Sequence, residues 1–111
     1  MFEELIDTRE VQGFTIHTFA CEEDVSSEGQ FASGDDAADA KIIEDIRAGN
    51  LTWFCAKVTA SKAGVILSED YLGACCYKSY DDFIKCGDYH ADMIASVVSQ
   101  ATAKIKELAA C

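Results

Sequence analysis

The sequence lacks the features on which membrane, secreted and multidomain proteins depend. It has 111 residues with no proline, no internal repeat and no low-complexity linker, so we expect one domain over residues 1–111. No apolar run approaches the roughly 18 residues that a membrane-spanning helix needs. The start, Met1–Glu4, is acidic where a signal peptide would be basic. We therefore expect a cytoplasmic protein.

Basic side chains are also scarce. Lys+Arg number 9 against 20 Asp+Glu, which gives a formal net charge of −11 at pH 7. A phosphate backbone would be repelled, so direct binding to DNA, RNA or anionic lipid is disfavoured. The excess is concentrated in residues 1–50, which carry a net charge of −10, whereas residues 51–111 carry −1. Such crowding opposes folding through self-repulsion and exceeds what solubility requires.

Two interpretations of the acidic half stay open. It is either a solvated loop and helix face or a surface that meets a basic partner, such as a protein that normally holds nucleic acid. On the second interpretation, the candidate partner-binding residues are the acidic side chains of two runs: Glu22, Glu23, Asp24, Glu28, Asp35, Asp36, Asp39, Glu44 and Asp45.

Motifs for catalysis and metal binding are nearly absent. The patterns C-x-x-C, G-x-G-x-x-G, H-E-x-x-H and G-x-S-x-G do not occur, which removes the usual zinc, nucleotide, metalloprotease and hydrolase spacings. The one candidate pair is Cys86 with His90, which would offer two metal ligands or a thiol with its base. Gly87 argues against a continuous helix between them, and a surface position is the favoured interpretation of His90. We expect neither catalysis nor a cofactor.

Cysteine usage is high, with residues at positions 21, 55, 75, 76, 86 and 111. An even number of cysteines suits a disulfide framework in secreted proteins, but the leader for that context is missing. Cys75 and Cys76 are adjacent, so on a strand they point to opposite faces. We expect reduced thiols.

Hydrophobic periodicity predicts three strands. Residues 11–20 are rich in β-branched and aromatic side chains and predict the first strand. Leu51–Ala60 and Val65–Tyr77 predict a hairpin over residues 51–77, with Gly64 in a left-handed position. Ser68–Asp70 interrupts the second of these runs and predicts a bulge or bend.

Two helices complete the prediction. Residues 22–36 have no periodicity and form an acidic loop, after which Ser33 or Asp35 caps a short helix that Gly49 ends. Ser79–Asp82 resembles a capping box. Apolar residues at three- and four-residue spacing predict a C-terminal helix over about 88–109. The order is β-α-β-β-α, an α+β fold with a small antiparallel sheet of about three strands packed against the long helix and a shorter one.

Aromatic residues are frequent between Trp53 and Tyr89, and we expect most of them to fill the core and its rim. An exposed subset would anchor a protein interface, because Tyr and Trp tend to dominate interface energies. Lys57, Tyr71 and Tyr77 are therefore secondary interface candidates.

The stretches Asn50–Gly64 and Asp70–Tyr77, with the strand Gly13–Ile16, resemble small accessory proteins of phages and mobile elements. Anti-CRISPR and antirestriction proteins are of this kind, and several look like nucleic-acid mimics that occupy a basic channel. The resemblance rests on compact size, acidity and a hairpin followed by a helix. It implies a stoichiometric inhibitor and assigns no role to any single residue.

Three hypotheses follow. The first is a non-enzymatic inhibitor whose acidic surface occupies a basic, nucleic-acid-binding site of a bacterial defence complex or another nucleic-acid-handling complex. The second is a small metal- or thiol-dependent enzyme or regulator at Cys86 and His90. The third is a structural protein that forms homodimers or larger homo-oligomers through an exposed sheet edge.

Overall fold

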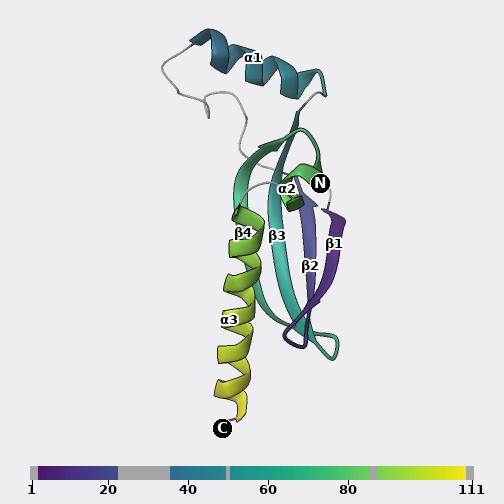
Figure 1. The fold of residues 1–111 in the computed structure, drawn as a ribbon, viewed down its shortest axis with the longest axis vertical. Coiled ribbons are helices and arrows are strands. Elements are labelled where there is room, and N and C mark those ends of the chain that lie inside the picture. The colour runs from purple at the N-terminus through teal and green to yellow at the C-terminus, as the bar shows by residue number, and fades with distance from the viewer. Residues whose placement is uncertain (1–2, 23–35, 50, 86–87, 110–111) are drawn as a thin grey trace.

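A four-stranded antiparallel sheet with helices packed on one face forms the body of the molecule (Figure 1). The computed structural model describes residues 3–22, 36–49, 51–85 and 88–109. The strands lie in the sheet in chain order, β1-β2-β3-β4. The elements are β1 (Glu3–Val11), β2 (Phe14–Cys21), α1 (Asp36–Arg47), β3 (Thr52–Lys62), β4 (Val65–Tyr77), α2 (Tyr80–Lys85) and α3 (Tyr89–Ala109). The predicted α+β class is confirmed.

The sheet has one strand more than the predicted three, because Glu3–Val11 forms the edge strand β1. This strand has no clear signal in the sequence. Four of its nine residues are acidic. Its register with β2 also shifts between Leu5 and Asp7, which interrupts the alternation of inward and outward side chains by which a strand is identified. Charged side chains suit an edge strand, since they discourage pairing with a further chain.

Both hairpins turn through two residues in the left-handed conformation. The φ angles are 51° at Gln12 and 87° at Gly13, and 53° at Ala63 and 79° at Gly64. Positive φ at both central residues defines a type I′ turn, whose twist matches that of the flanking strands. The prediction for Gly64 is confirmed. The predicted strand over 11–20 is corrected, because Val11 ends β1, Gln12 and Gly13 form this turn, and β2 begins at Phe14.

The pairing of β4 with β3 is irregular at two places. Ser68, Glu69 and Asp70 pair in regular register, so the predicted bulge at these residues is wrong. The register shifts instead on either side of them, between Ile66 and Ser68 and between Leu72 and Cys75. Each shift changes which side chains of β4 point to which face.

The predicted long C-terminal helix is confirmed as α3, which packs on β3 and β4. Figure 1 shows it lying along the sheet. Its buried stripe is Met93, Ile94, Val97, Val98 and Ala101. At the far end of the stripe, Leu108 is 58% exposed, so the apolar pattern continues beyond the part of the helix that the sheet covers.

The shorter helices have the expected ends. The Asp82 amide donates to Ser79 Oγ at 3.2 Å, as the capping box predicts. The Gly49 amide, with φ at 82°, donates to the Ile46 carbonyl at 3.2 Å just after α1 ends. The predicted caps of α1, Ser33 and Asp35, lie outside the described residues.

The core lies between the sheet and the helices α2 and α3. Phe54 is its centre, with its ring centroid 5.1 Å from that of Tyr80 and 5.6 Å from that of Phe83, both edge to face. Such contacts add to the gain from burying the rings. No helix in the described part of the chain is both long enough and apolar enough to cross a membrane.

Candidate functional site

The two faces of the sheet differ in burial, and β2 shows this most clearly. Phe14, Ile16, Thr18 and Ala20 are buried toward the helices, whereas the residues between them are half-buried. We call the second face the open face. The following residues share it by register: Glu3, Leu5, Thr8, His17, Phe19, Cys21, Cys55, Lys57, Thr59, Glu69 and Tyr71.

One row of the open face combines apolar and aromatic side chains with a lysine. Leu5 pairs with Phe19, Phe19 with Lys57, and Lys57 with Tyr71, so the row crosses all four strands. We call these four residues the Phe19 row. Leu5 is 52% and Tyr71 56% exposed. Lys57 Nζ lies 5.5 Å from the Phe19 ring centroid and 6.0 Å from the Tyr71 centroid, within cation–π range of both.

Carboxylates lie next to the Phe19 row. Glu3 Oε1 is 3.5 Å from Lys57 Nζ, and the Tyr71 hydroxyl donates to Glu69 Oε2 at 2.8 Å. Burial lowers the pKa of Lys57, but Tyr71, Glu3 and Glu69 together raise this pKa by more, so the net shift is upward. The hydrogen bond to Glu69 raises the pKa of Tyr71, and burial adds to that effect. At neutral pH, Lys57 is therefore charged and Tyr71 protonated.

The structure brings together two of the three secondary interface candidates. Lys57 and Tyr71 are neighbours on the open face. Tyr77 lies on the other face, with its ring 5.3 Å from that of Phe83 in the core. Tyr71 and Tyr77 are six residues apart and would share a face in a regular strand, but the register shift between Leu72 and Cys75 reverses the alternation. Tyr77 is thus excluded from the open face.

Most of the predicted acidic partner-binding residues fall outside what the structure describes. Glu23, Asp24, Glu28 and Asp35 lie outside the described residues, and so do the side chains of Asp36 and Asp39.

The remaining acidic candidates have described positions. Glu22 is exposed and follows the last residue of β2. Glu44 is exposed on α1, and Asp45 Oδ1 is 3.5 Å from Lys41 Nζ on the same helix. Figure 1 shows α1 beyond the end of the sheet where β2 ends and β3 begins. The three described acidic candidates thus lie toward that end.

The prediction of a surface position for His90 is wrong. His90 is 2% exposed, its Nε2 is 2.8 Å from Thr18 Oγ1, and its ring also forms a hydrogen bond with the Ile84 backbone. Burial lowers its pKa, Arg9 lowers it further, and Asp7 and the Ile84 bond partly oppose this. His90 therefore links α3 to β2 inside the core. A sequence shows no signal for this, because the partner is 72 residues away.

The alternative site at Cys86 and His90 gains no support from this position. Cys86 lies outside the described residues, and the imidazole of His90 is turned to the core, where it already has hydrogen-bond partners. Over the residues that can be placed, no group of three or more His, Cys, Asp or Glu side chains is arranged to hold a metal ion.

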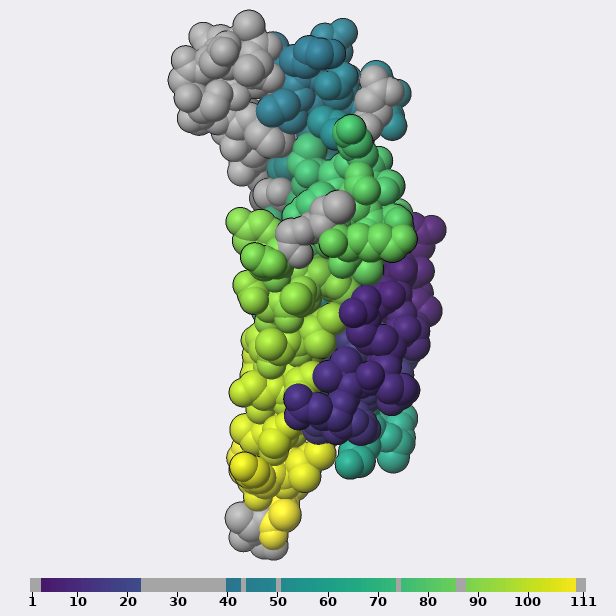
Figure 2. Space-filling view, viewed as in Figure 1, coloured from purple at the N-terminus to yellow at the C-terminus, as the bar shows by residue number. Residues whose placement is uncertain are grey.

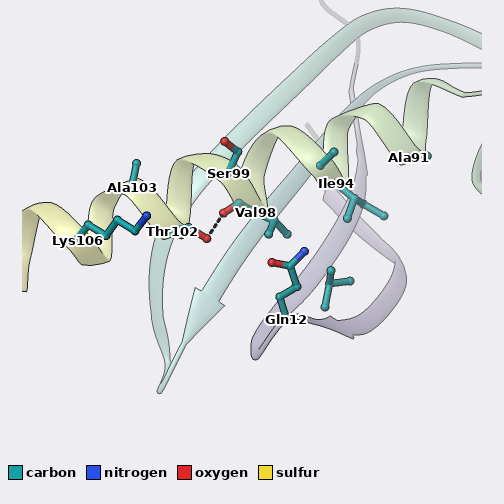
Figure 3. A pocket seen from close by; sticks show the side chains of 10 residues that line it. Gln12, Ala91, Ile94, Val98, Ser99, Thr102, Ala103 and Lys106 are labelled. Carbon is teal, nitrogen blue, oxygen red and sulfur yellow. Dashed lines mark hydrogen bonds between the residues drawn. The ribbon is translucent and has the colours of Figure 1, made fainter.

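A groove of about 600 Å³ separates α3 from the turn between β1 and β2. Figure 2 shows the surfaces of α3 and β1 side by side, and Figure 3 shows the side chains in the groove. The lining is mostly small or apolar, and the Thr102 hydroxyl bonds to the Val98 carbonyl at 2.8 Å. Lys106 is the one charged side chain among the lining residues. Gln12, Ser99 and Thr102 are the other polar side chains of the lining, and the Thr102 hydroxyl is already bonded within α3.

The structure identifies two residues of the Phe19 row that sequence analysis missed, Leu5 and Phe19. Leu5 was hidden with the rest of β1. Phe19 had a readable signal, because in the alternation of residues 14–21 it falls with His17 on the face opposite Ile16. The open face is the surface on which a functional argument rests. No protein-family model, curated protein or solved structure matches this chain.

Proposed function

We propose that this protein is a non-enzymatic, protein-binding inhibitor that occupies a basic site of a nucleic-acid-handling complex, in the manner of anti-CRISPR proteins. The open face is its main contact surface, and the acidic segment over residues 22–45 brings the partner to it. The observation that carries the proposal is the Phe19 row, in which exposed Leu5 and Tyr71 flank half-buried Phe19 and Lys57. Carboxylates lie beside the row, on the sheet face opposite the described helices α2 and α3.

The composition of the Phe19 row supports a protein partner. Protein interfaces draw most of their binding energy from a few large side chains at their centre, surrounded by a polar rim. Phe19 and Tyr71 supply aromatic area, Leu5 adds exposed aliphatic surface, and Glu3 and Glu69 supply a rim. Lys57 is held between the two rings by contacts within the chain, so little side-chain entropy is left to lose on binding.

The charge of the chain supports a basic partner. The formal net charge is −11, which repels nucleic acid and attracts the surfaces that bind nucleic acid. Complementary charge mainly accelerates association, whereas buried aromatic contacts slow dissociation. The acidic segment and the open face therefore have separate roles in the proposal. The acidic segment sets the rate of association, and the open face sets the lifetime of the complex.

The test is affinity capture from nuclease-treated bacterial lysate with matched surface variants. Leu5→Ser and Tyr71→Ser alter the open face. Leu108→Ser is the matched control, because Leu108 is 58% exposed against 52% for Leu5 but lies on α3. We expect wild type and Leu108→Ser to retain a nucleic-acid-binding complex that duplex DNA or RNA displaces, and the two open-face variants to lose it.

Equal capture by all four proteins would move the interface away from the open face. Capture that nucleic acid does not displace would contradict the proposed site on the partner. A mass in solution that rises with concentration, and that Leu5→Ser abolishes, would assign the open face to self-association instead.

Kinetics with the purified partner separate the two roles. Charge reversal at Asp35, Asp36 and Asp39 should slow association at low salt and leave dissociation nearly unchanged. Tyr71→Ser should do the opposite. An association rate at low salt that charge reversal does not change would remove the acidic segment from the proposal.

A further inference from the structure

Two cysteines far apart in the sequence lie opposite each other on the open face. Cys21 is the last residue of β2, and it pairs directly with Cys55 of β3 in the antiparallel register. Directly opposed residues point to the same face, and both thiols are half-buried. In the structure each is a thiol, and Cys55 Sγ lies 3.8 Å from the Ala56 carbonyl oxygen.

We propose that Cys21 and Cys55 are a redox-active pair that forms a reversible cross-strand disulfide. Directly opposed residues in an antiparallel pair have Cα atoms about 4.5 or 5.5 Å apart, inside the range of about 4.4–6.8 Å that a disulfide spans. Their Cβ atoms, about 4.5–5.5 Å apart, need to approach by only a small amount to reach the usual disulfide spacing. No rearrangement of the fold is required.

The other described cysteines do not have this geometry. Cys75 is 4% exposed in the core, with its thiol 3.2 Å from the Leu72 carbonyl oxygen. Cys76 pairs with Trp53, so it is not directly opposed to another cysteine as Cys21 is to Cys55. Cys75 and Cys76 are adjacent and point to opposite faces. Among the residues the structure describes, the register thus selects one pair.

The reaction is thiol–disulfide exchange with a small-molecule disulfide such as oxidised glutathione. The Cys21 thiolate attacks one sulfur of glutathione disulfide, and one glutathione thiolate leaves as the mixed disulfide forms. The Cys55 thiolate then attacks the Cys21 sulfur, and the second glutathione leaves. The protein loses two hydrogens and glutathione disulfide becomes two glutathione thiols, so electrons and protons balance.

A Cys21–Cys55 disulfide would change the connection between β2 and β3, which contains the acidic segment. Residues 22–51 leave β2 just after Cys21 and return just before β3. A Cys21–Cys55 bond would close this excursion into a covalent loop next to the Phe19 row. Because cross-linking reduces the freedom of the unfolded chain, the oxidised protein should unfold at a higher urea concentration than the reduced protein.

The experiment is oxidation of the folded full chain with oxidised glutathione at pH 8.5, followed by N-ethylmaleimide and mass spectrometry. Trypsin places Cys21 in peptide 10–41 and Cys55 in peptide 48–57, separate from the peptides that contain Cys75 and Cys76, Cys86, or Cys111. We expect the oxidised protein to carry two N-ethylmaleimide adducts fewer than the reduced protein, because the disulfide removes two thiols, and we expect a linked 10–41/48–57 peptide pair that dithiothreitol separates.

Matched variants make the result decisive. Cys21→Ser and Cys55→Ser should each abolish the link, and Cys76→Ser should retain it. A stable glutathione adduct on Cys21 that never resolves, or a link to any other cysteine, would overturn the proposal. A link that forms only after urea unfolding would also overturn it. So would an unchanged mass of the folded protein after oxidation. The urea midpoint of the oxidised form gives a second readout, and no increase would contradict the expected closure of the loop.

Discussion

His90 is the residue through which mild acid should act on stability. Its pKa is below the ordinary value of about 6.5 in the folded protein, chiefly because of burial, and returns to that value on unfolding. The unfolded chain therefore binds a proton that the folded chain does not, and stability falls as the pH drops below 6.5 toward the folded-state pKa. We expect the free energy of unfolding to decrease between pH 7.5 and 5.5, with a slope approaching at most about 1.4 kcal/mol per pH unit for one proton.

Urea unfolding at several pH values measures this slope. His90→Gln removes the titrating ring and should flatten the slope, although it also lowers stability at every pH because the bond to Thr18 is altered. His17→Gln is the control for loss of a histidine on the open face. If His90→Gln and wild type show equal slopes over this range, His90 does not cause the acid sensitivity.

The thiol of Cys21 has two charged neighbours that should change its reactivity in opposite directions. Burial raises its pKa, Glu3 raises it further, and Lys57 lowers it. Glu3→Gln should therefore increase the thiolate fraction at pH 7.5, and Lys57→Met should decrease it. We expect alkylation of Cys21 by iodoacetamide to become a few-fold faster in the first variant and slower in the second.

The labelled tryptic peptide 10–41 reports Cys21 alone, because it contains no other cysteine. Cys76 is the internal reference, since burial is the cause of its raised pKa. If Cys21 and Cys76 change in parallel in both variants, the effect is a general loosening of the sheet, and the electrostatic account fails.

At the scale of the elements, the two hairpin turns differ from position to position in how well their residues favour the left-handed backbone conformation. Gly13 and Gly64 occupy the second left-handed position of their turns, but Gln12 and Ala63 occupy the first. A left-handed conformation costs an ordinary L-residue about 1–2 kcal/mol, whereas asparagine adopts it more readily. Ala63→Asn should therefore stabilise the protein by up to about 1 kcal/mol, and Gly64→Ala should destabilise it by a similar amount.

The difference in urea midpoint between each variant and wild type measures the effect. Val65→Thr, at a 59% exposed position next to the turn, controls for a polar substitution at this end of the hairpin. A destabilised Ala63→Asn protein would show that the turn is not of type I′ in solution.

The elements also show where prediction from sequence reached its limit. Local signals were sufficient for α3, for the Ser79 cap and for Gly64, because three- and four-residue periodicity, a capping hydroxyl and a positive φ depend on neighbours in the chain. The prediction failed where a partner strand decides the outcome. β1 is an edge strand by virtue of pairing with β2, and Tyr77 turns to the core because of a register shift against β3.

In the candidate site, too, local features were predicted and features that depend on strand pairing were not. The sequence predicts a cation and tyrosines near the hairpin, and the structure places Lys57 and Tyr71 together. The sequence does not predict that Leu5 and Phe19 lie in the same row as Lys57 and Tyr71. Nor does it predict that Cys21 pairs with Cys55, because both relations depend on the register of β2 with β1 and β3. A shift of one residue in either pairing would send those side chains to the other face.

For the whole molecule, the balance of charge decides how salt acts on stability. The chain carries a formal net charge of −11 within extents of 56 × 26 × 23 Å. At 0.01 M ionic strength the Debye length is about 30 Å, comparable to the width of the molecule, so carboxylates repel one another across it. Ion pairs oppose this repulsion, but an exposed pair such as Lys85–Asp81 contributes little to stability.

Screening should therefore stabilise the protein. Between 0.01 and 0.15 M NaCl the Debye length falls to about 8 Å, which removes most of the long-range repulsion. We expect the free energy of unfolding in urea to rise by on the order of 1 kcal/mol over this range. The double variant Glu4→Gln, Glu44→Gln neutralises two exposed carboxylates and should show a smaller rise from a higher starting stability, while KCl should act as NaCl does. Lower stability at higher salt would mean that the surface ion pairs outweigh the self-repulsion.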